Sequence, residues 1–398
     1  MIYLLGGAGN GNFGDELIVR CWLEALRAAG VEAPVVCDGN YAGISRRFLG
    51  TLHPEVAFVD DVNRLKARGP DTFYAAFARG WRFYDNGGFE RHPDLAGLAA
   101  RLAQTRVLHL HGGGYVNTIW PKNAFLLGFA AATSRAFGCR LVGTGLGLLP
   151  AAPAPELYRP LLAEAIAAFD LIEVRDRWSF DWLRGLSDSP RIVLGLDDSF
   201  LMRREPPAAP GPRTLHVSWF GFADGFEAVL DAAAGARAAG FERVLFWGCI
   251  DHDLRLFDRL AAACRGAEAI RWQDLVQGPI PVRPGDHLIT ARFHPHLIAA
   301  RYGATGAYRV DQGYYDVKQG SIVDLGSPFR RIGAGPLAEL PAAPPAFNPI
   351  VRLDAGRVAA KRRLAAWIHG ELLAAAPAAD AAPLPLAVPE TAAAALLF

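Results

Sequence analysis

The sequence lacks an excess of charge of either sign. It has 41 lysine and arginine residues against 40 aspartate and glutamate residues, which gives a formal net charge of +1. Proteins that bind nucleic acid or acidic membrane surfaces through long-range attraction carry a clear basic excess. The composition therefore indicates neither partner. Only four of the basic residues are lysines, namely Lys66, Lys122, Lys318 and Lys361, and this bias says little about function.

Cysteine is also scarce. The five cysteines are scattered and contain no Cys-x-x-Cys pair (Cys21, Cys37, Cys139, Cys249 and Cys264). Such a set fits buried free thiols in a reducing compartment better than a disulfide framework or a zinc site. No group of histidines, cysteines and carboxylates has the spacing of metal ligands, so we expect no metal.

Long apolar runs are missing as well. No segment approaches the ~20 apolar residues that a membrane span needs. Residues 1–7 have neither the basic residues nor the apolar length of a signal peptide. We therefore expect a cytoplasmic protein with no membrane span and no nucleic-acid partner.

The chain of 398 residues, with 52% hydrophobic and 20% charged residues, predicts a folded protein of two domains. In the first half, strand-like apolar runs alternate with helical stretches, which is typical of a parallel sheet covered on both faces. The predicted strands are residues 2–5, 34–37, 107–111, 140–144, 171–174 and 192–194, and the predicted helices include 16–29, 124–137 and 156–168.

A proline-rich stretch, residues 203–213, interrupts this alternation and is predicted to be a linker. The pattern then restarts, with strands at 215–219, 244–247 and 288–291 and helices at 226–239, 254–265, 296–302 and 317–325. We therefore predict an α/β protein of two Rossmann-like domains, residues 1–203 and 213–373, facing each other across a cleft. An Ala/Pro-rich tail, 374–398, follows. Residues 79–94 lack periodicity and form a candidate lid or acceptor-recognition loop, or an ordinary surface loop.

The most informative motif is Arg292-Phe293-His294, between a predicted strand and a predicted helix. In open α/β sheets, ligands bind at the carboxyl ends of strands, and helix N-termini attract anions. An arginine fork for a carboxylate or phosphate thus lies beside a histidine that can move protons near neutral pH. A surface arginine and a capping histidine are the alternative. His296 is expected on the opposite side of the helix, where its replacement should have a mild effect.

Three glycine-rich turns follow strands in the first half. Residues 9–14 match the dinucleotide fingerprint G-x-G-x-x-G, and Asp38 ends the next strand. However, Asp15 and Glu16 would repel a pyrophosphate there, so NAD binding is the less favoured interpretation. The turns at 111–115 and 143–147 should leave main-chain NH groups open to a ligand, because glycine has no Cβ.

Taken in order, these motifs resemble the polysaccharide pyruvyltransferases, over residues 1 to about 330. The series is Asn12-x-Gly14-Asp15-Glu16, His111-Gly112-Gly113-Gly114, Gly143-x-Gly145, Val174-Arg175-Asp176 with Ser179, Asp197-Asp198, Arg292-Phe293-His294 and Tyr315-x-x-Lys318. One departure is Phe293, where the family typically has leucine.

The resemblance implies a GT-B-like fold and an EC 2.5.1-type transferase of polysaccharide or exopolysaccharide biosynthesis. Phosphoenolpyruvate would be the donor substrate, with no separate cofactor, and its pyruvyl group would form a ketal with two sugar hydroxyls. The first domain would hold the acceptor, a sugar or glycan with or without a lipid carrier, and the second domain the donor. The sequence leaves the oligomeric state open.

The resemblance also implies the site residues. His294 and Asp15 would be catalytic, with His294 moving protons and Asp15 orienting the acceptor or acting as a second base; a helix cap is the alternative for Asp15. The residues implied to bind substrate are Arg175, Arg292, Lys318, Gly112, Gly113, Gly114, Asn12 and Gly14.

Two other classes stay open. A GT-B glycosyltransferase would bind a nucleotide sugar in the second domain and would use Asp311 or Asp324 for the ribose hydroxyls. A non-catalytic or NAD-binding Rossmann protein is the second alternative, but it would leave the Arg292–His294 pair without a task.

Overall fold

The computed structural model describes residues 1–205, 211–221, 224–310, 313–333, 340 and 348–374. These residues form two compact units. The first contains 1–10, 15–201 and 359–374, and the second contains 11–14 and the described part of 202–358. The predicted domain ranges thus differ from the units at residues 11–14 and from 359 onward. Residues 206–210 of the predicted linker and 375–398 of the predicted tail lie outside the described residues.

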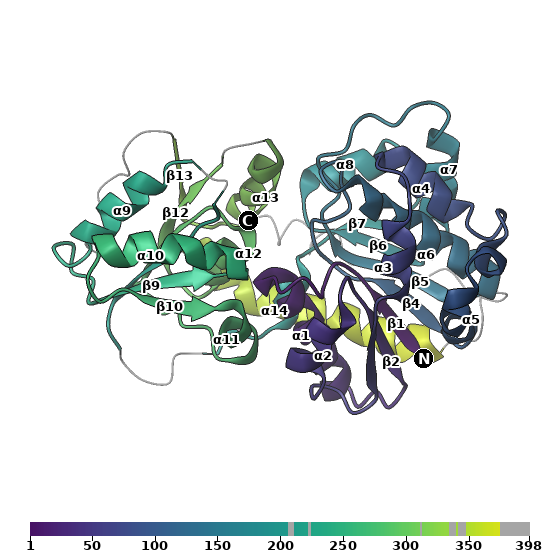
Figure 1. Ribbon diagram of the computed structural model, residues 1–398, viewed down its shortest axis with the longest axis horizontal. Coiled ribbons are helices and arrows are strands. Elements are labelled where there is room, and N and C mark those ends of the chain that lie inside the picture. The colour runs from purple at the N-terminus through teal and green to yellow at the C-terminus, as the bar shows by residue number, and fades with distance from the viewer. Residues whose placement is uncertain (206–210, 222–223, 311–312, 334–339, 341–347, 375–398) are drawn as a thin grey trace. The chain divides into compact units, whose positions relative to one another are not determined.

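The first unit is built on a sheet of seven strands in the order β3-β2-β1-β4-β5-β6-β7, in which every neighbouring pair is parallel (Figure 1). The strands are β1 (Ile2–Leu5), β2 (Val35–Asp38), β3 (Val56–Val59), β4 (Val107–Leu110), β5 (Arg140–Leu146), β6 (Leu171–Val174) and β7 (Ile192–Leu194). The central strands are buried along their whole length, as expected for a parallel sheet with both faces covered.

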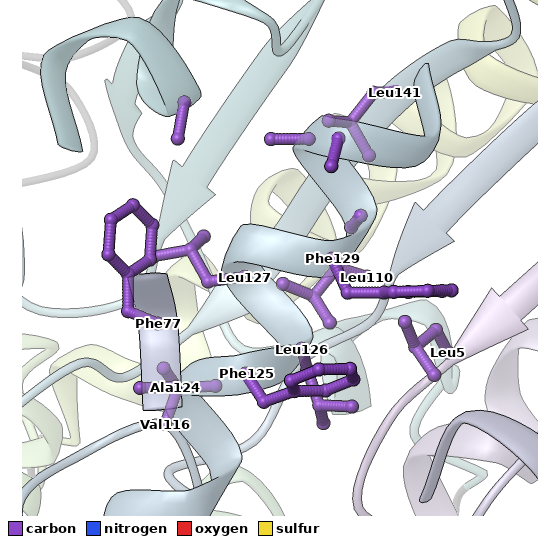
Figure 2. Packing of buried hydrophobic residues seen from close by; sticks show 14 of the residues in the cluster. Leu5, Phe77, Leu110, Val116, Ala124, Phe125, Leu126, Leu127, Phe129 and Leu141 are labelled. Carbon is purple, nitrogen blue, oxygen red and sulfur yellow. The ribbon is translucent and has the colours of Figure 1, made fainter. Parts of the chain in front are cut away.

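Helices connect these strands. They are α1 (Phe13–Ala28), α2 (Ala42–Leu49), α3 (Asp61–Ala67), α4 (Phe73–Trp81), α5 (Ala96–Ala103), α6 (Ala124–Phe137), α7 (Arg159–Ala167) and α8 (Arg177–Arg184), with short 3-10 turns η1 (Gly88–Arg91), η2 (Pro93–Leu95), η3 (Pro121–Asn123) and η4 (Asp198–Leu201). Helix α6 is central to the core: Figure 2 shows its side chains with Leu5 and Leu110 of the sheet and Phe77 of α4. Glycines let α4 and α6 approach closely, since a Cβ at Gly80 or Gly128 would overlap the backbone of the other helix.

Residues 79–94 are not a free loop or lid. Their first residues end α4, and the 3-10 turn η1 and the start of η2 follow. Phe83 is 5% exposed, and its ring lies 5.2 Å from that of Phe129 on α6. The Tyr84 hydroxyl is 3.0 Å from Thr133 Oγ1 on the same helix. The aromatic residues that broke the sequence period therefore pack against α6.

The second unit repeats the arrangement with six parallel strands in the order β10-β9-β8-β11-β12-β13. The strands are β8 (Thr214–Ser218), β9 (Arg243–Gly248), β10 (Glu268–Arg271), β11 (His287–Thr290), β12 (Thr305–Arg309) and β13 (Arg330–Ile332). The helices are α9 (Phe226–Gly235), α10 (Leu254–Ala263), α11 (Trp272–Gln277), α12 (Phe293–Arg301) and α13 (Gly313–Asp324), with the 3-10 turn η5 (Asp251–Asp253). Two parallel sheets with helices confirm the predicted α/β class.

Helix α14 (Pro349–Ala366) and the π-helical segment η6 (Trp367–Leu372) complete the described chain. The beginning of α14 belongs to the second unit, where Asp354 Oδ1 lies 2.6 Å from Arg301 Nε. From Ala359 onward the helix belongs to the first unit. There the Lys361 side chain is fully buried among first-unit residues. Sequence analysis had placed this whole stretch in the second domain.

Candidate functional site

The Arg292–His294 motif lies at the carboxyl end of β11, as predicted, but the following helix starts earlier than expected. Helix α12 begins at Phe293, so Arg292 is its N-cap residue and His294 lies in its first turn. Pro295 fits there because the first turn of a helix needs no NH group from it. The Arg292 NH donates to Thr290 Oγ1 at 2.9 Å, which fixes the end of the strand to the start of the helix.

The Arg292 guanidinium is partly engaged. Its Nη2 lies 2.5 Å from Oδ1 of Asp253, a fully buried carboxylate, and its Cζ lies 5.3 Å from the centre of the Phe220 ring. Burial raises the pKa of Asp253, and the charge of Arg292 opposes this rise. Arg292 Nε is buried and has no hydrogen-bond partner among the described residues. A guanidinium has five NH donors, so Arg292 can hold Asp253 and still bind an anion.

His294 packs directly on the glycine of the first motif. A Cβ atom at Gly14 would overlap the His294 ring, so any other residue here would force that ring to shift. Asn12 Oδ1 accepts the Gly14 NH at 3.0 Å and thereby caps α1. The Phe13 NH donates to the Cys249 carbonyl at 2.8 Å. Three predicted site residues that are far apart in the sequence, Asn12 and Gly14 on one side and His294 on the other, therefore meet within the second unit. Asp15 is the next residue of the chain after Gly14.

Helix α13, which carries Lys318, contacts the ring beside Arg292 through Tyr315. Tyr315, one helical turn before Lys318 on α13, stacks on Phe220 with ring centres 5.2 Å apart. Phe220 is the ring over which Arg292 lies. Residues three apart on a helix share a face, so Lys318 lies on the side of α13 that carries Tyr315.

In the second and third glycine turns, main-chain NH groups donate hydrogen bonds to other protein groups, contrary to the expectation that they are open to a ligand. The Gly112 NH donates to Asp198 Oδ2 at 2.7 Å, and the Gly113 NH donates to the Gly145 carbonyl at 3.4 Å. The absence of a Cβ serves close packing here: a Cβ at Gly112 would lie 2.8 Å from Asp198 Oδ2. A Cβ at Gly113 would lie 3.8 Å from Asp15 Oδ1, which places Asp15 beside this turn within the first unit, where Gly114 follows.

Asp198 is the centre of a buried network that sequence analysis missed. Besides the Gly112 NH, it accepts the Trp22 indole NH at 2.8 Å and the Thr144 hydroxyl at 2.9 Å. Lys361 Nζ lies 2.7 Å from Asp198 Oδ1 and also contacts Glu173. Asp198 thus connects the glycine turns to α1 and to α14. The signal in the sequence that could have indicated this network is Lys361, a lone lysine in an alanine-rich helix.

Glu173 gives this network its second carboxylate. It accepts the Gly145 NH and the Leu196 NH, both at 3.1 Å. Burial alone would lower the pKa of Lys361, but Asp198 and Glu173 outweigh it and raise that pKa. Burial raises the pKa of Glu173, and Lys361 opposes the rise. A single ammonium group therefore holds two carboxylates that in turn hold both glycine turns.

Arg175 lies in the first unit, at the end of β6. Its side chain is 3% exposed, and Nη1 lies 2.6 Å from Asp197 Oδ2. Asp176 follows as the N-cap of α8 and accepts the Ser179 NH at 2.7 Å. The motif Val174-Arg175-Asp176 with Ser179 therefore has a clear local function as a strand end and helix cap. That Arg175 and Arg292 hold one ligand stays a prediction.

Comparison with known sequences identifies the family. The profile of the polysaccharide pyruvyl transferase family matches residues 12–296, a span that contains Gly14 and His294. The chain belongs to the polysaccharide pyruvyl transferase family. As a family member it is a transferase, and the contact between Gly14 and His294 joins the two ends of the matched span. No curated protein sequence is similar enough to count as a match.

Solved structures similar to this chain show its fold. A glycosyltransferase of Rickettsia africae aligns with a TM-score of 0.51 at 8% identity and covers 94% of this chain and 99% of its own. A Listeria monocytogenes protein assigned as a UDP-N-acetylglucosamine 2-epimerase aligns with a TM-score of 0.51 at 11% identity, covering 94% and 91%. A UDP-GlcNAc 2-epimerase of Neisseria meningitidis gives 0.50 at 6%, covering 94% of each chain. At these identities the similarity shows the GT-B-like fold and nothing about substrates.

The groups that an NAD site would use form hydrogen bonds within the protein. The Gly9 NH donates to Glu16 Oε1 at 2.6 Å, and Glu16 Oε2 accepts the Ser45 hydroxyl at 2.8 Å. Asp38 accepts the Tyr3 hydroxyl at 2.7 Å and the Val62 NH at 2.9 Å. The first turn therefore resembles the dinucleotide fingerprint in sequence, but its Gly9 NH is bonded to Glu16.

Phe293 lies edge-on to His294, with ring centres 5.0 Å apart, so the departure from the family pattern touches the proposed catalytic residue. Asp324 ends α13, and Asp311 lies outside the described residues. Within the described chain, no helix combines the length and apolar character needed to cross a bilayer, and no three histidine, cysteine or carboxylate groups gather as metal ligands.

The structure corrects the expectation that replacing His296 would be mild. His296 is fully buried, with Nδ1 2.6 Å from Gln319 Oε1 and Nε2 2.7 Å from Ser327 Oγ, and its ring stacks on Phe329. Burial lowers the pKa of His296 to about 3. The histidine is thus a neutral core residue that joins α12 to α13 and to the segment before β13.

His296→Ala should lower the free energy of unfolding by roughly 3 kcal/mol at pH 7.5, because it leaves a cavity and two unpaired polar partners. The deficit should shrink as the pH falls from about 6.5 towards 3. In that window the unfolded wild-type histidine takes up a proton that the folded one does not, so wild type alone loses stability. Urea unfolding of both proteins at pH 7.5 and 5 measures this, and a deficit that grows at pH 5 would contradict it.

Proposed function

We propose that the protein transfers the pyruvyl group of phosphoenolpyruvate to two hydroxyl groups of a sugar. In this reaction C3 of the donor takes up a proton and becomes a methyl group. C2 forms bonds to both hydroxyl oxygens, and the bond between C2 and the phosphate oxygen breaks. The two hydroxyls release two protons: one balances the proton on C3, and the other leaves with phosphate. The products are a pyruvate ketal and inorganic phosphate.

The observation that carries this proposal is the family match across residues 12–296. The residues inside that span have suitable chemistry. His294 lies in the first turn of α12 and packs on Gly14. An imidazole can give a proton to C3 or take one from a hydroxyl near neutral pH, a contribution of roughly 10²–10⁴-fold. Asp15 lies beside the Gly113 turn and is proposed to orient the acceptor or act as a second base.

The donor has two anionic ends and needs directional cationic partners. Arg292 is the first of these, because its buried Nε has no hydrogen-bond partner among the described residues and α12 starts beside it. Lys318 is proposed to add a charge from α13. Arg175 is proposed as a further anion-binding residue on the family resemblance alone, since the structure pairs it with Asp197. Gly112, Gly113 and Gly114 are proposed to shape the acceptor side through their backbone.

Arg292→Ala should raise the apparent KM for phosphoenolpyruvate at least roughly tenfold, because a charge-assisted hydrogen bond contributes about 1.5–3 kcal/mol. Arg243→Ala is the matched control, since Arg243 forms an exposed ion pair with Glu268 in the same unit. Steady-state kinetics with varied donor and saturating acceptor measures both. An unchanged KM in Arg292→Ala would remove Arg292 from the donor site.

The reaction itself is tested by mass spectrometry of glycans incubated with the protein and phosphoenolpyruvate. The expected product carries a ketal-linked pyruvate, and phosphate appears in equal amount. A parallel incubation with UDP-sugars in place of phosphoenolpyruvate tests the glycosyltransferase alternative. Glycan extension by a sugar, with no pyruvate incorporated from phosphoenolpyruvate, would refute the proposal.

A further inference from the structure

The exposed apolar side chains of the first unit are not scattered at random. In the part of the chain that the structure describes, seven large hydrophobic side chains are exposed, namely Tyr41, Ile119, Trp120, Phe137, Leu157, Trp178 and Val323. Five of them lie on segments that directly follow strands of the first sheet, after β2, β4, β5 and β6. The carboxyl ends of parallel strands meet at one edge, so these five side chains share that edge. We call Tyr41, Ile119, Trp120, Leu157 and Trp178 the apolar rim.

The part of the rim after β4 is held rigidly. Asn117 is fully buried, and its Nδ2 donates to the Gly114 carbonyl at 2.8 Å. Its Oδ1 accepts the Ile119 NH at 2.9 Å and the Trp120 NH at 3.1 Å. One buried amide therefore fixes the exposed pair Ile119–Trp120 to the second glycine turn. A loop held in this way cannot turn its apolar side chains inward.

Hydrogen bonds connect this loop to the part of the rim that carries Trp178. The Thr118 NH donates to the Pro150 carbonyl, in the segment after β5, at 2.9 Å. In that same segment the Leu148 NH donates to Ser179 Oγ at 2.9 Å, in the first turn of α8 next to Trp178. Trp178 is 42% exposed and Trp120 is 46% exposed. Hydrogen bonds therefore link the backbone segments that carry the two tryptophans. Trp120 lies six residues after Gly114, and Trp178 lies three residues after Arg175.

The charges around the rim are mixed. Lys122 lies 3.1 Å from Asp71, and Trp178 is flanked by exposed Arg177 and Asp181. A membrane-docking surface would need a cluster of basic residues to attract anionic lipids, and none is present at these described positions. Flat aromatic faces separated by polar groups instead suit sugar rings, which offer C–H bonds on their faces and hydroxyls at their edges.

We propose that the apolar rim binds the acceptor glycan, with Trp120 and Trp178 stacking on sugar rings beyond the ring that receives pyruvate. The rim follows the strands that end at the glycine turns and at Arg175, so an acceptor that occupies it lies at the same edge of the first sheet as these proposed site residues. This inference rests on the proposed function, because the acceptor is a saccharide only if the transfer reaction is the one proposed. It assigns glycan-chain recognition to surface side chains outside the reacting groups.

The test compares Trp120→Ala, Trp178→Ala and the double variant with wild type and with Phe137→Ala. Phe137 is 36% exposed at the last residue of α6, at the opposite end of that helix from Trp120. The probe is a panel of defined gluco-, galacto- and mannooligosaccharides of one to six residues, bound without donor. Each tryptophan variant should lose roughly tenfold or more in affinity for the longer glycans that wild type binds, as for other central aromatic contacts. Phe137→Ala should bind like wild type.

The outcomes separate this inference from the proposed function. Equal glycan binding by all variants, or no binding by wild type to any glycan of the panel, would overturn the assignment of the rim. A loss of binding to phosphatidylglycerol vesicles in the tryptophan variants, with glycan binding unchanged, would also overturn it, in favour of a membrane surface. Pyruvate transfer by wild type is assayed separately: wild type that binds glycans through the rim but incorporates no pyruvate refutes the reaction and leaves the rim intact.

Discussion

Replacing Lys361 by methionine is expected to lower the free energy of unfolding by about 3–5 kcal/mol, the range for breaking a buried ion pair on one side. The methionine fills much the same space but removes the ammonium group that contacts both Asp198 and Glu173. Both carboxylates are buried, so their charges would face each other without compensation. Denaturant unfolding of wild type and variant measures the difference.

Two variants give this experiment its controls. Lys122→Met removes a lysine whose partner, Asp71, is 84% exposed, so its effect should stay within about 1 kcal/mol. Adding Glu173→Gln to Lys361→Met should recover part of the loss, because one of the two uncompensated carboxylates becomes neutral. If Lys361→Met is as mild as Lys122→Met, the buried network does not hold α14 to the first unit.

The same network explains why the glycine turns could not be interpreted correctly from sequence. The Gly112 NH is taken by Asp198, which lies 86 residues further along the chain. Local spacing shows that a turn has no Cβ to block a ligand, but it does not show which distant carboxylate fills the space. Arg175 and Arg292 illustrate the same limit: both were predicted as anion-binding residues, and each has a buried aspartate partner from another segment.

The sheets, in contrast, follow closely from local sequence. A central strand such as β1 is apolar on both faces, and that pattern is visible in the chain itself. The strands that sequence analysis missed include β3 and β10, which lie at sheet edges and are largely exposed or half-buried. Their mixed polarity resembles that of a loop. Helix α14 was missed because its packing depends on single buried charges, Arg301 with Asp354 and Lys361 with Asp198, and not on a continuous apolar face.

The Arg292-Phe293-His294 motif was the most informative feature of the sequence, and the structure adds a contact to it. Spacing alone placed His294 at a strand end over a helix start, and α12 does begin there. The packing of His294 on Gly14 joins two motifs that are 280 residues apart in the chain. A buried histidine on the same helix, His296, shows that position in the motif and not residue type separates the proposed site residue from a core residue.

His294→Ala is expected to lower kcat by roughly 10²–10⁴-fold while the KM for phosphoenolpyruvate changes little, if His294 transfers the proton. His294→Gln should be nearly as impaired, because an amide cannot exchange a proton near pH 7. The amide does reach a similar distance and can donate a hydrogen bond, so this variant removes proton transfer alone. His252→Ala is the control, since His252 is an exposed histidine of the same unit on η5. The measurement is phosphate release and pyruvate incorporation at saturating donor, with urea midpoints to verify that each variant folds.

The glutamine variant decides between the two roles that remain for this histidine. A proton-transfer group cannot be replaced by an amide, so low activity in both variants with an unchanged urea midpoint supports catalysis by His294. If His294→Gln keeps most of its kcat while His294→Ala does not, the histidine only donates a hydrogen bond. The acid–base group must then be sought at Asp15, which follows Gly14 directly and lies beside the Gly113 turn. In that case Asp15→Asn, which has a similar shape but no carboxyl proton to exchange, should lower kcat by roughly 10²–10⁴-fold.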